Sequence, residues 1–311
     1  MEDYWYRLAD QKNVIFFDFI VLLKKKRTFA KIYTLYSKMK YKTINGSSRH
    51  PYNYLDRYLT EVRAQGRYAF TVEELQNELN VSLLAIRQNL FRLKLKNEIA
   101  IIRQGFYVII PPEYSKPGML PPYLYIDDLM KSLDKPYYVG LLSAAALHGA
   151  AHQQPTGYTV VTQIPAPRSV ERLKISFFSK QEFLQDGIIQ KKSPAGYFNV
   201  SSPELTALDL FDYIHKFGIN QITTILQELS EEMKPSLLLK LAKKYPNTAA
   251  IQRLGYILEK VVSSEKLSDA IWKALEERTF FPTLLSPQKP KKGEMDNRWK
   301  IIENMLIESD L

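Results

Sequence analysis

A proline-rich segment, PPEYSKPGMLPP at residues 111–122, constrains the fold of this chain more than any other feature. It contains five prolines and one glycine in twelve residues. Proline lacks the backbone N–H that helices and central strands require, so neither element is expected to run through the segment. We therefore assign residues 51–113 to a first domain, 114–122 to a linker and 123–311 to a larger second domain.

The first domain has the pattern of three short helices followed by a hairpin. Apolar residues at helical spacing predict the first helix. Thr71 and Glu74 match a capping box at the start of the second helix, and Ser82 is a suitable N-cap for the third. The run EIAIIRQGFYVII, residues 98–110, predicts two strands joined at Gly105. This order of elements is that of a winged helix-turn-helix.

The third predicted helix divides into two faces. Aliphatic residues recur along it at spacings of three and four, which predicts one buried face. They are Leu83, Ile86, Leu90 and Leu93. The other positions are rich in amide and cationic side chains, which suit base edges and phosphates of a DNA major groove. The candidate DNA-binding residues, with two from the wing, are Ser82, Ala85, Arg87, Gln88, Asn89, Arg92, Lys94, Lys96, Arg103 and Gln104.

Different roles are expected within this set. Gln88 and Asn89 can pair with adenine, and Arg92 with guanine. Arg87, Lys94 and the wing residue Arg103 suit phosphates, which supply affinity without sequence information. A cationic helix can equally be a solvated surface, and a wing can instead contact a protein. The net charge of +10 and the surrounding pattern favour DNA.

The second domain mixes strands and helices. YYVGLLSAAALHG, residues 137–149, predicts a helix of small side chains, and GYTVVTQI, RLKISFFS and GYFNVSS predict strands. From Pro203 onward the chain predicts successive amphipathic helices. The end, RWKIIENMLIESDL at 298–311, predicts a final helix. The predicted fold class is α+β, with an N-terminal winged helix-turn-helix joined to a larger mixed α/β domain with a helical tail.

The chain has few residues suited to catalysis. Without cysteine it has no disulfides, thiol nucleophiles or cysteine zinc sites. Glu204 and Asp209 could hold a metal in a nuclease, but five residues of separation place them on different helix faces. We expect Ser202 to cap a helix, Asp209 to cap, pair with a cation or hold the helix on the sheet, and His148 to end the Ala-rich helix. We predict no enzyme activity, no metal and no cofactor.

Residues 1–50 form an extension before these domains. Its apolar run VIFFDFIVLL, residues 14–23, is too short for a membrane span and contains Asp18. The segment 1–38 could be a membrane-surface helix, a helix packed on the fold, or an extension before a true start at Met39. The pattern of a signal peptide is not present, and we predict a cytoplasmic protein with no membrane partner.

Four segments of the second domain occur in an order typical of a known family. They are YYVGLLSAAALHGAAHQQP, VVTQIPAPR, ISFFSKQEF and GYFNVSSPELTALDLFDY. Following a winged helix, and with the tail WKIIENMLIESDL, they resemble the AbiEi family of antitoxins from bacterial type IV toxin-antitoxin systems. The resemblance covers residues 55–311, and the motifs LLSAAALHG and SPELTALDL are specific only in combination.

This resemblance implies an antitoxin in two parts. The winged helix would bind double-stranded DNA at the promoter of its own operon and repress it. The C-terminal domain would counteract a nucleotidyltransferase-like toxin, as a rule without a stable complex. The resemblance implies no individual residue for that second step. The residues alone leave open a winged-helix transcriptional regulator whose second domain senses a ligand or protein and has no toxin partner.

Overall fold

The computed structural model describes residues 54–307, except 117, 151–156 and 169–173. The interpretations of the extension 1–50 therefore lie outside the described residues. Residues Asn53–Leu311 form one compact unit. Within the part that is described, no helix combines the length and the apolar content that crossing a bilayer requires.

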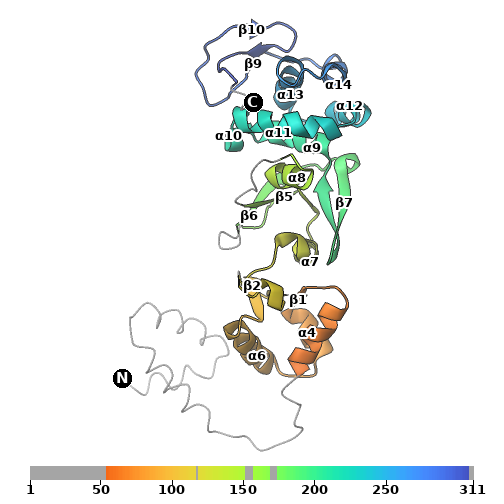
Figure 1. The fold of residues 1–311 in the computed structure, drawn as a ribbon, viewed down its shortest axis with the longest axis vertical. Helices are drawn as coiled ribbons and strands as arrows, with labels where there is room; N and C mark the ends of the chain where they lie inside the picture. The colour runs from red at the N-terminus through yellow and green to blue at the C-terminus, as the bar shows by residue number, and fades with distance from the viewer. Residues whose placement is uncertain (1–53, 117, 151–156, 169–173, 308–311) are drawn as a thin grey trace, which may run out of the picture. The chain divides into compact units, whose positions relative to one another are not determined.

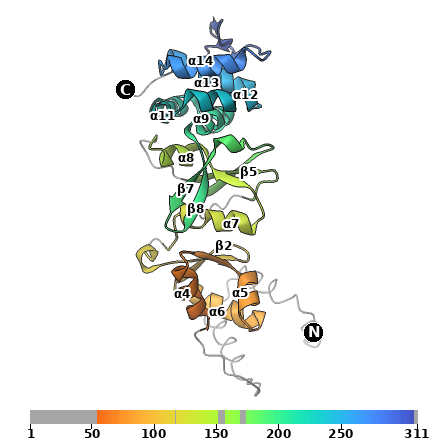
Figure 2. The same cartoon turned by 90° about the vertical axis from the view of Figure 1, so that its right-hand side faces the viewer.

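The described chain begins with three helices and a small antiparallel sheet. In chain order the elements are α4 (Tyr54–Ala64), β1 (Ala69–Thr71), α5 (Val72–Glu78), α6 (Leu83–Leu95), β2 (Ile99–Arg103) and β3 (Phe106–Ile109). The strand order is β1–β3–β2, and Figure 2 shows the three helices together on one side of these strands. Gly105, in the β2–β3 turn, has a φ of +81°, a conformation that glycine adopts without strain. The expected helices and hairpin are confirmed as elements.

The side chains of this sheet alternate between two hydrophobic clusters. Phe70 and Ile109 pack with the three helices. Their neighbours Ala69 and Val108 belong to a second cluster that includes Ile126. Successive side chains of a strand point to opposite faces, so both faces of the sheet are covered. The covering explains why the hairpin sequence is apolar almost throughout.

Local hydrogen bonds begin two of these helices where the sequence predicts. The Oγ1 atom of Thr71 accepts from the backbone N of Glu74 at 3.0 Å, and the Glu74 carboxylate accepts from the backbone N of Thr71 at 3.1 Å. Ser82 Oγ accepts from the backbone N of Ala85 at 3.3 Å. The predicted capping box and N-cap are both confirmed.

Thr71→Ala should lower the free energy of unfolding by about 1 kcal/mol, because it leaves a helix-end N–H without its acceptor. Urea denaturation of the purified protein measures the change. Thr60→Ala is the matched control, since Thr60 is exposed on α4 and its hydroxyl donates only to Asp56 O of its own helix. A loss at Thr71 no larger than that at Thr60 would contradict the prediction.

A five-stranded mixed sheet follows. The connecting elements are η1 (Pro112–Tyr114), η2 (Pro122–Leu124) and α7 (Ile126–Ser132). The strands of the sheet are β4 (Tyr137–Val139), β5 (Tyr158–Gln163), β6 (Ile175–Lys180), β7 (Ile188–Ser193) and β8 (Gly196–Ser201). Helix α8 (Leu141–Leu147) lies between β4 and β5 in the chain, and η4 (Gln185–Gly187) lies between β6 and β7. The strand order is β6–β5–β4–β8–β7. Figure 1 labels β5, β6 and β7 of this sheet. β4 pairs parallel with β8 and antiparallel with β5, so it is central.

The structure corrects the helix predicted at residues 137–149. Tyr137–Val139 form the central strand β4, and the helix begins only at Leu141. All three residues of β4 are buried, because Tyr138 packs in one hydrophobic cluster and Tyr137 and Val139 pack in another on the opposite face. Three predicted strands are confirmed as β5, β6 and β8, whereas the edge strand β7 was not predicted.

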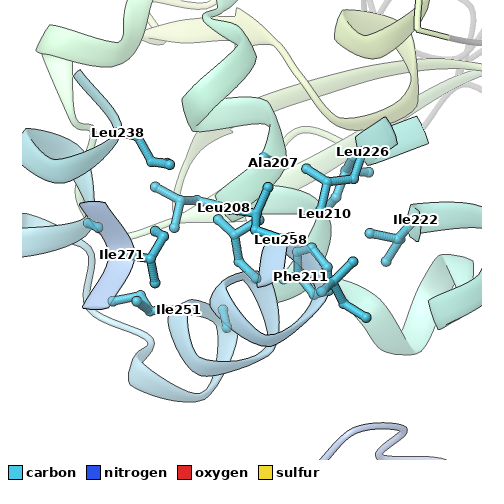
Figure 3. Packing of buried hydrophobic residues seen from close by; sticks show 14 of the residues in the cluster. Ala207, Leu208, Leu210, Phe211, Ile222, Leu226, Leu238, Ile251, Leu258 and Ile271 are labelled. Carbon is cyan, nitrogen blue, oxygen red and sulfur yellow. The ribbon is translucent and has the colours of Figure 1, made fainter. Parts of the chain in front are cut away.

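Helices follow the sheet from residue 203 to residue 275 and form most of one hydrophobic core. They are α9 (Pro203–Asp212), α10 (Ile214–Phe217), α11 (Ile219–Glu232), α12 (Pro235–Lys244), α13 (Thr248–Lys260) and α14 (Glu265–Leu275). Figure 3 shows Leu208 and Phe211 of α9 pointing among aliphatic side chains of its neighbours, including Ile222, Leu258 and Ile271. Nearly every residue of α9 is buried, which makes it the central helix of this cluster.

The predicted helix at residues 298–311 is wrong over its described part. The chain instead forms three short strands, β9 (Thr283–Leu284), β10 (Met295–Asp296) and β11 (Ile301–Ile302), with turns between them. Trp299 is fully buried, and its indole Nε1 donates to Glu259 of α13 at 3.0 Å. Tertiary anchoring of Trp299 thus overrides the local helical pattern.

Candidate nucleic-acid interface

Helix α6 carries cations on its exposed surface and no acidic residue. Arg87, Arg92 and Lys94 lie on it, and Lys96 is its C-cap; all four side chains are exposed. Lys96 forms an exposed ion pair with Glu98 at 3.8 Å. A helix surface with this excess of positive charge attracts polyanions, and the long, flexible Arg and Lys side chains suit contacts to phosphates.

The other four predicted residues of this region differ in their exposure and contacts. Ser82 is exposed and caps the helix. Ala85 is half-buried, and Gln88 is exposed. The Nδ2 atom of Asn89 donates to the Tyr54 hydroxyl at 2.5 Å and to Ala85 O at 3.0 Å. Asn89 would have to release these bonds before its amide nitrogen could contact a base.

The two predicted wing residues differ in exposure. Gln104 is exposed at the β2–β3 turn, whereas Arg103 is half-buried. The Nη1 atom of Arg103 is buried and has no hydrogen-bond partner in the described part of the chain. Both residues line a cavity of about 710 Å³, together with Glu73 of α5, Leu129 of α7 and Arg168. The predicted phosphate contact of Arg103 therefore requires its side chain to turn outward.

The outermost face of α6 is apolar, which the sequence interpretation did not include. Three large side chains are exposed there, Leu84 to 67%, Phe91 to 50% and Leu95 to 69%. With 100° of rotation per residue they form one stripe with Gln88, opposite the buried face. The buried residues are Ile86, Leu90 and Leu93, while Leu83, which was also expected to be buried, is only half-buried.

The predicted cations therefore flank this stripe rather than fill it. Helical rotation places Arg92 and Lys96 on one side, and Arg87 and Lys94 on the other. The sequence already indicates this apolar stripe, since α6 has more large apolar residues than one face can bury. A helical projection of all its residues would have shown the second apolar stripe.

A second polar cluster lies in the core of the C-terminal region. The fully buried carboxylate of Asp209 accepts from the hydroxyls of Tyr138 at 2.7 Å and Tyr245 at 2.9 Å, and forms an ion pair with Lys180. Asp212 accepts from Tyr245 at 3.0 Å and lies 3.5 Å from the Lys180 Nζ. The cluster links strands β4 and β6 with the helices. It confirms the expected pairing of Asp209 with a cation.

Burial sets the protonation of this cluster. It raises the pKa of the Tyr138 and Tyr245 hydroxyls well above the usual value, and the charge of Asp209 raises it further. Both hydroxyls are therefore neutral donors to the Asp209 carboxylate. A carboxylate whose oxygens are occupied in this way is suited to holding elements together.

Glu204 and His148 also have structural roles. Glu204 is buried in the first turn of α9, and its Oε1 accepts from the backbone N of Lys234 at 2.7 Å. His148 ends α8, as predicted, with Nε2 at 2.7 Å from Ser201 O. Burial lowers the pKa of His148, so the neutral ring donates from Nε2. The described residues contain no group of three or more His, Asp or Glu placed to hold a metal.

Comparison with known proteins gives a family match over part of this chain. Residues 138–260 match the family model described as the AbiEi antitoxin C-terminal domain, which confirms the resemblance over these residues. The chain is also similar to the crystal structure of the RV2827C protein from Mycobacterium tuberculosis, at 16% identity and a TM-score of 0.60. That similarity covers 82% of this chain and 92% of the other, and it shows a shared fold. A search of curated proteins gave no match.

Proposed function

From the match of residues 138–260 to the C-terminal domain of AbiEi antitoxins, we propose that this protein is a DNA-binding antitoxin. In this proposal the N-terminal elements bind the promoter of the protein's own operon and repress it. The C-terminal region neutralises a toxin of the nucleotidyltransferase class without a stable complex. The protein acts in the cytoplasm, where the promoter lies, and it acts by binding rather than by catalysis.

One observation supports the DNA-binding half above the others. The elements α4, α5, α6 and the β2–β3 hairpin follow the order of a winged helix-turn-helix, and α6 occupies the place of the recognition helix. It buries one face, exposes its cations and carries no acid. The excess of basic residues in the whole chain also favours DNA binding.

Arg92→Ala should reduce affinity for the upstream DNA of the protein's own gene by about 1–3 kcal/mol, because its guanidinium can reach a base edge. Lys94→Ala should instead weaken binding to promoter and random DNA alike and reduce the salt slope by about one. Gel shifts over a range of salt concentrations measure both effects. Lys266→Ala is the control, since this exposed lysine lies on α14. Wild-type protein that binds random DNA as tightly as promoter DNA would contradict operator binding.

The antitoxin half needs a separate test. The adjacent gene and this chain are expressed from independent inducible promoters, so that loss of repression cannot change the dose of either protein. The full chain should relieve growth inhibition by the adjacent gene product. An Arg87→Ala, Arg92→Ala, Lys94→Ala variant should lose promoter binding and still relieve inhibition. Failure of the full chain to relieve inhibition would remove the antitoxin half of the proposal.

The cavity near the hairpin turn favours one alternative function. Its volume of about 710 Å³ is in the range of small-molecule sites, and Arg103 and Arg168 line it. A winged-helix regulator that senses an anionic ligand through this cavity, with no toxin partner, is therefore the second candidate. The gene neighbourhood separates the two, because an adjacent nucleotidyltransferase gene is expected only for the antitoxin.

A further inference from the structure

The apolar stripe of α6 indicates what kind of DNA the proposed interface would read. Leu84, Phe91 and Leu95 are at least half exposed, so the stripe contributes little to the stability of the fold. Exposed large apolar residues that gather on one helix face mark an interaction surface. Gln88 lies among them, between the first two.

Charge complementarity selects DNA as the occupant. Cations border the stripe on both sides, Arg87 and Lys94 along one edge and Arg92 and Lys96 along the other. A DNA major groove is about 12 Å wide, admits one helix, and is bordered on both sides by phosphates. A helix whose apolar stripe has cations on both sides matches that cross-section. The stripe would face the bases, and cations beside it would face the phosphates.

The side chains of the stripe then indicate which bases the helix would contact. In the major groove, thymine alone presents a methyl group, and apolar side chains contact it. Glutamine pairs bidentately with the N6 and N7 atoms of adenine. Leu84 and Phe91 therefore match thymine, and Gln88 matches adenine. Leu95 lies in the last turn, where the helix leaves the groove, and is assigned no base.

We propose that α6 reads a short run of A·T pairs, with the thymine C5 methyl groups packed against Leu84 and Phe91 and an adenine held by Gln88. This inference rests on the proposed DNA-binding function. It adds contacts from the apolar stripe to the base contact expected for Arg92, which lies at the edge of that stripe.

Replacement of thymine by deoxyuridine tests the inference, since it removes only the methyl group. The region of upstream DNA that the full chain protects is synthesised with thymine, with deoxyuridine, and as a scrambled duplex of equal length. Fluorescence anisotropy at fixed salt gives each affinity. Loss of a buried methyl should weaken binding by about fourfold, so two contacts should cost more than tenfold.

Exposed residues provide matched variants that keep the fold intact. Leu84→Ala and Phe91→Ala should each reduce the preference for thymine over deoxyuridine, and the double variant should abolish it. The controls are Leu306→Ala and Phe281→Ala, whose parent side chains are exposed to 89% and 73% outside α6. They should keep the full preference. Circular dichroism and light scattering check folding and oligomeric state.

The outcomes separate the inference from the function on which it rests. Equal binding of the promoter and scrambled duplexes would overturn both. Preference for the promoter with equal affinity for thymine and deoxyuridine would overturn the inference alone. If Leu84→Ala and Phe91→Ala change the oligomeric state and leave the thymine preference intact, the stripe is a protein interface and the inference also fails.

Discussion

Asp209→Ala should lower the free energy of unfolding by about 3–5 kcal/mol, because it removes the nearer of the two carboxylates beside a largely buried cation and leaves only Asp212, at 3.5 Å. Asp209 is fully buried, and the side chain of Lys180 is only 11% exposed. The same substitution removes the acceptor of the Tyr138 hydroxyl, whose only hydrogen bond within the described part of the chain is to this carboxylate. Desolvated donors and charges of this kind are costly to leave unpaired.

Asp186→Ala is the matched control for this prediction. Asp186 also contacts two lysines, Lys240 at 2.8 Å and Lys244 at 3.0 Å, but all three side chains are at least one-third exposed. Exposed ion pairs contribute little, so no resolvable change is expected. Urea denaturation of both variants gives the comparison. Equal effects at the two positions would mean that Asp209 does not link the sheet to the helices.

The Asp209 variant also separates a structural role from a catalytic one. If Glu204 and Asp209 were metal ligands of a nuclease, alanine at either position would abolish metal-dependent cleavage. The occupied oxygens of Asp209 instead predict loss of stability. Cleavage of DNA or RNA by the wild-type protein with added Mg²⁺, lost in both variants without loss of stability, would support an enzyme.

Trp299→Ala should lower the free energy of unfolding by a similar amount, about 3–5 kcal/mol. Trp299 is fully buried against α13, and the absence of a side chain at Gly255 makes room for it. A Cβ atom at Gly255 would lie 2.0 Å from the Trp299 Cζ3 atom. Gly255→Ala should therefore destabilise the wild-type protein by about 1–3 kcal/mol through overpacking.

The sign of the Gly255→Ala effect should reverse when the indole is removed. In the Trp299→Ala background the steric conflict is absent, and alanine is the better helix former by about 0.5–1 kcal/mol. The double variant should thus be more stable than Trp299→Ala alone. A thermodynamic cycle from four denaturation curves measures the coupling. Additive effects would show that Gly255 and Trp299 do not share the packing seen here.

Tertiary pairing decided the elements that the sequence misassigned. The Tyr137–Val139 segment has no period that distinguishes a strand from a buried helix, and it is a strand because β5 and β8 lie on either side. Apolar and polar residues around Trp299 recur at spacings that also fit a helix. It is held in turns because Trp299 fills the space at Gly255, a distant position in the chain.

The sequence by itself determined the features that depend on neighbours in the chain. The capping box of Thr71 and Glu74, the Ser82 cap and the turn at Gly105 follow from hydrogen bonds and backbone angles within a few residues. Only the tertiary structure decided that Lys180 neutralises Asp209, since no local pattern joins residues on a strand and a helix. It also decided how far individual side chains of α6 are buried, since Leu83, which the spacing places on the buried face, is only half-buried.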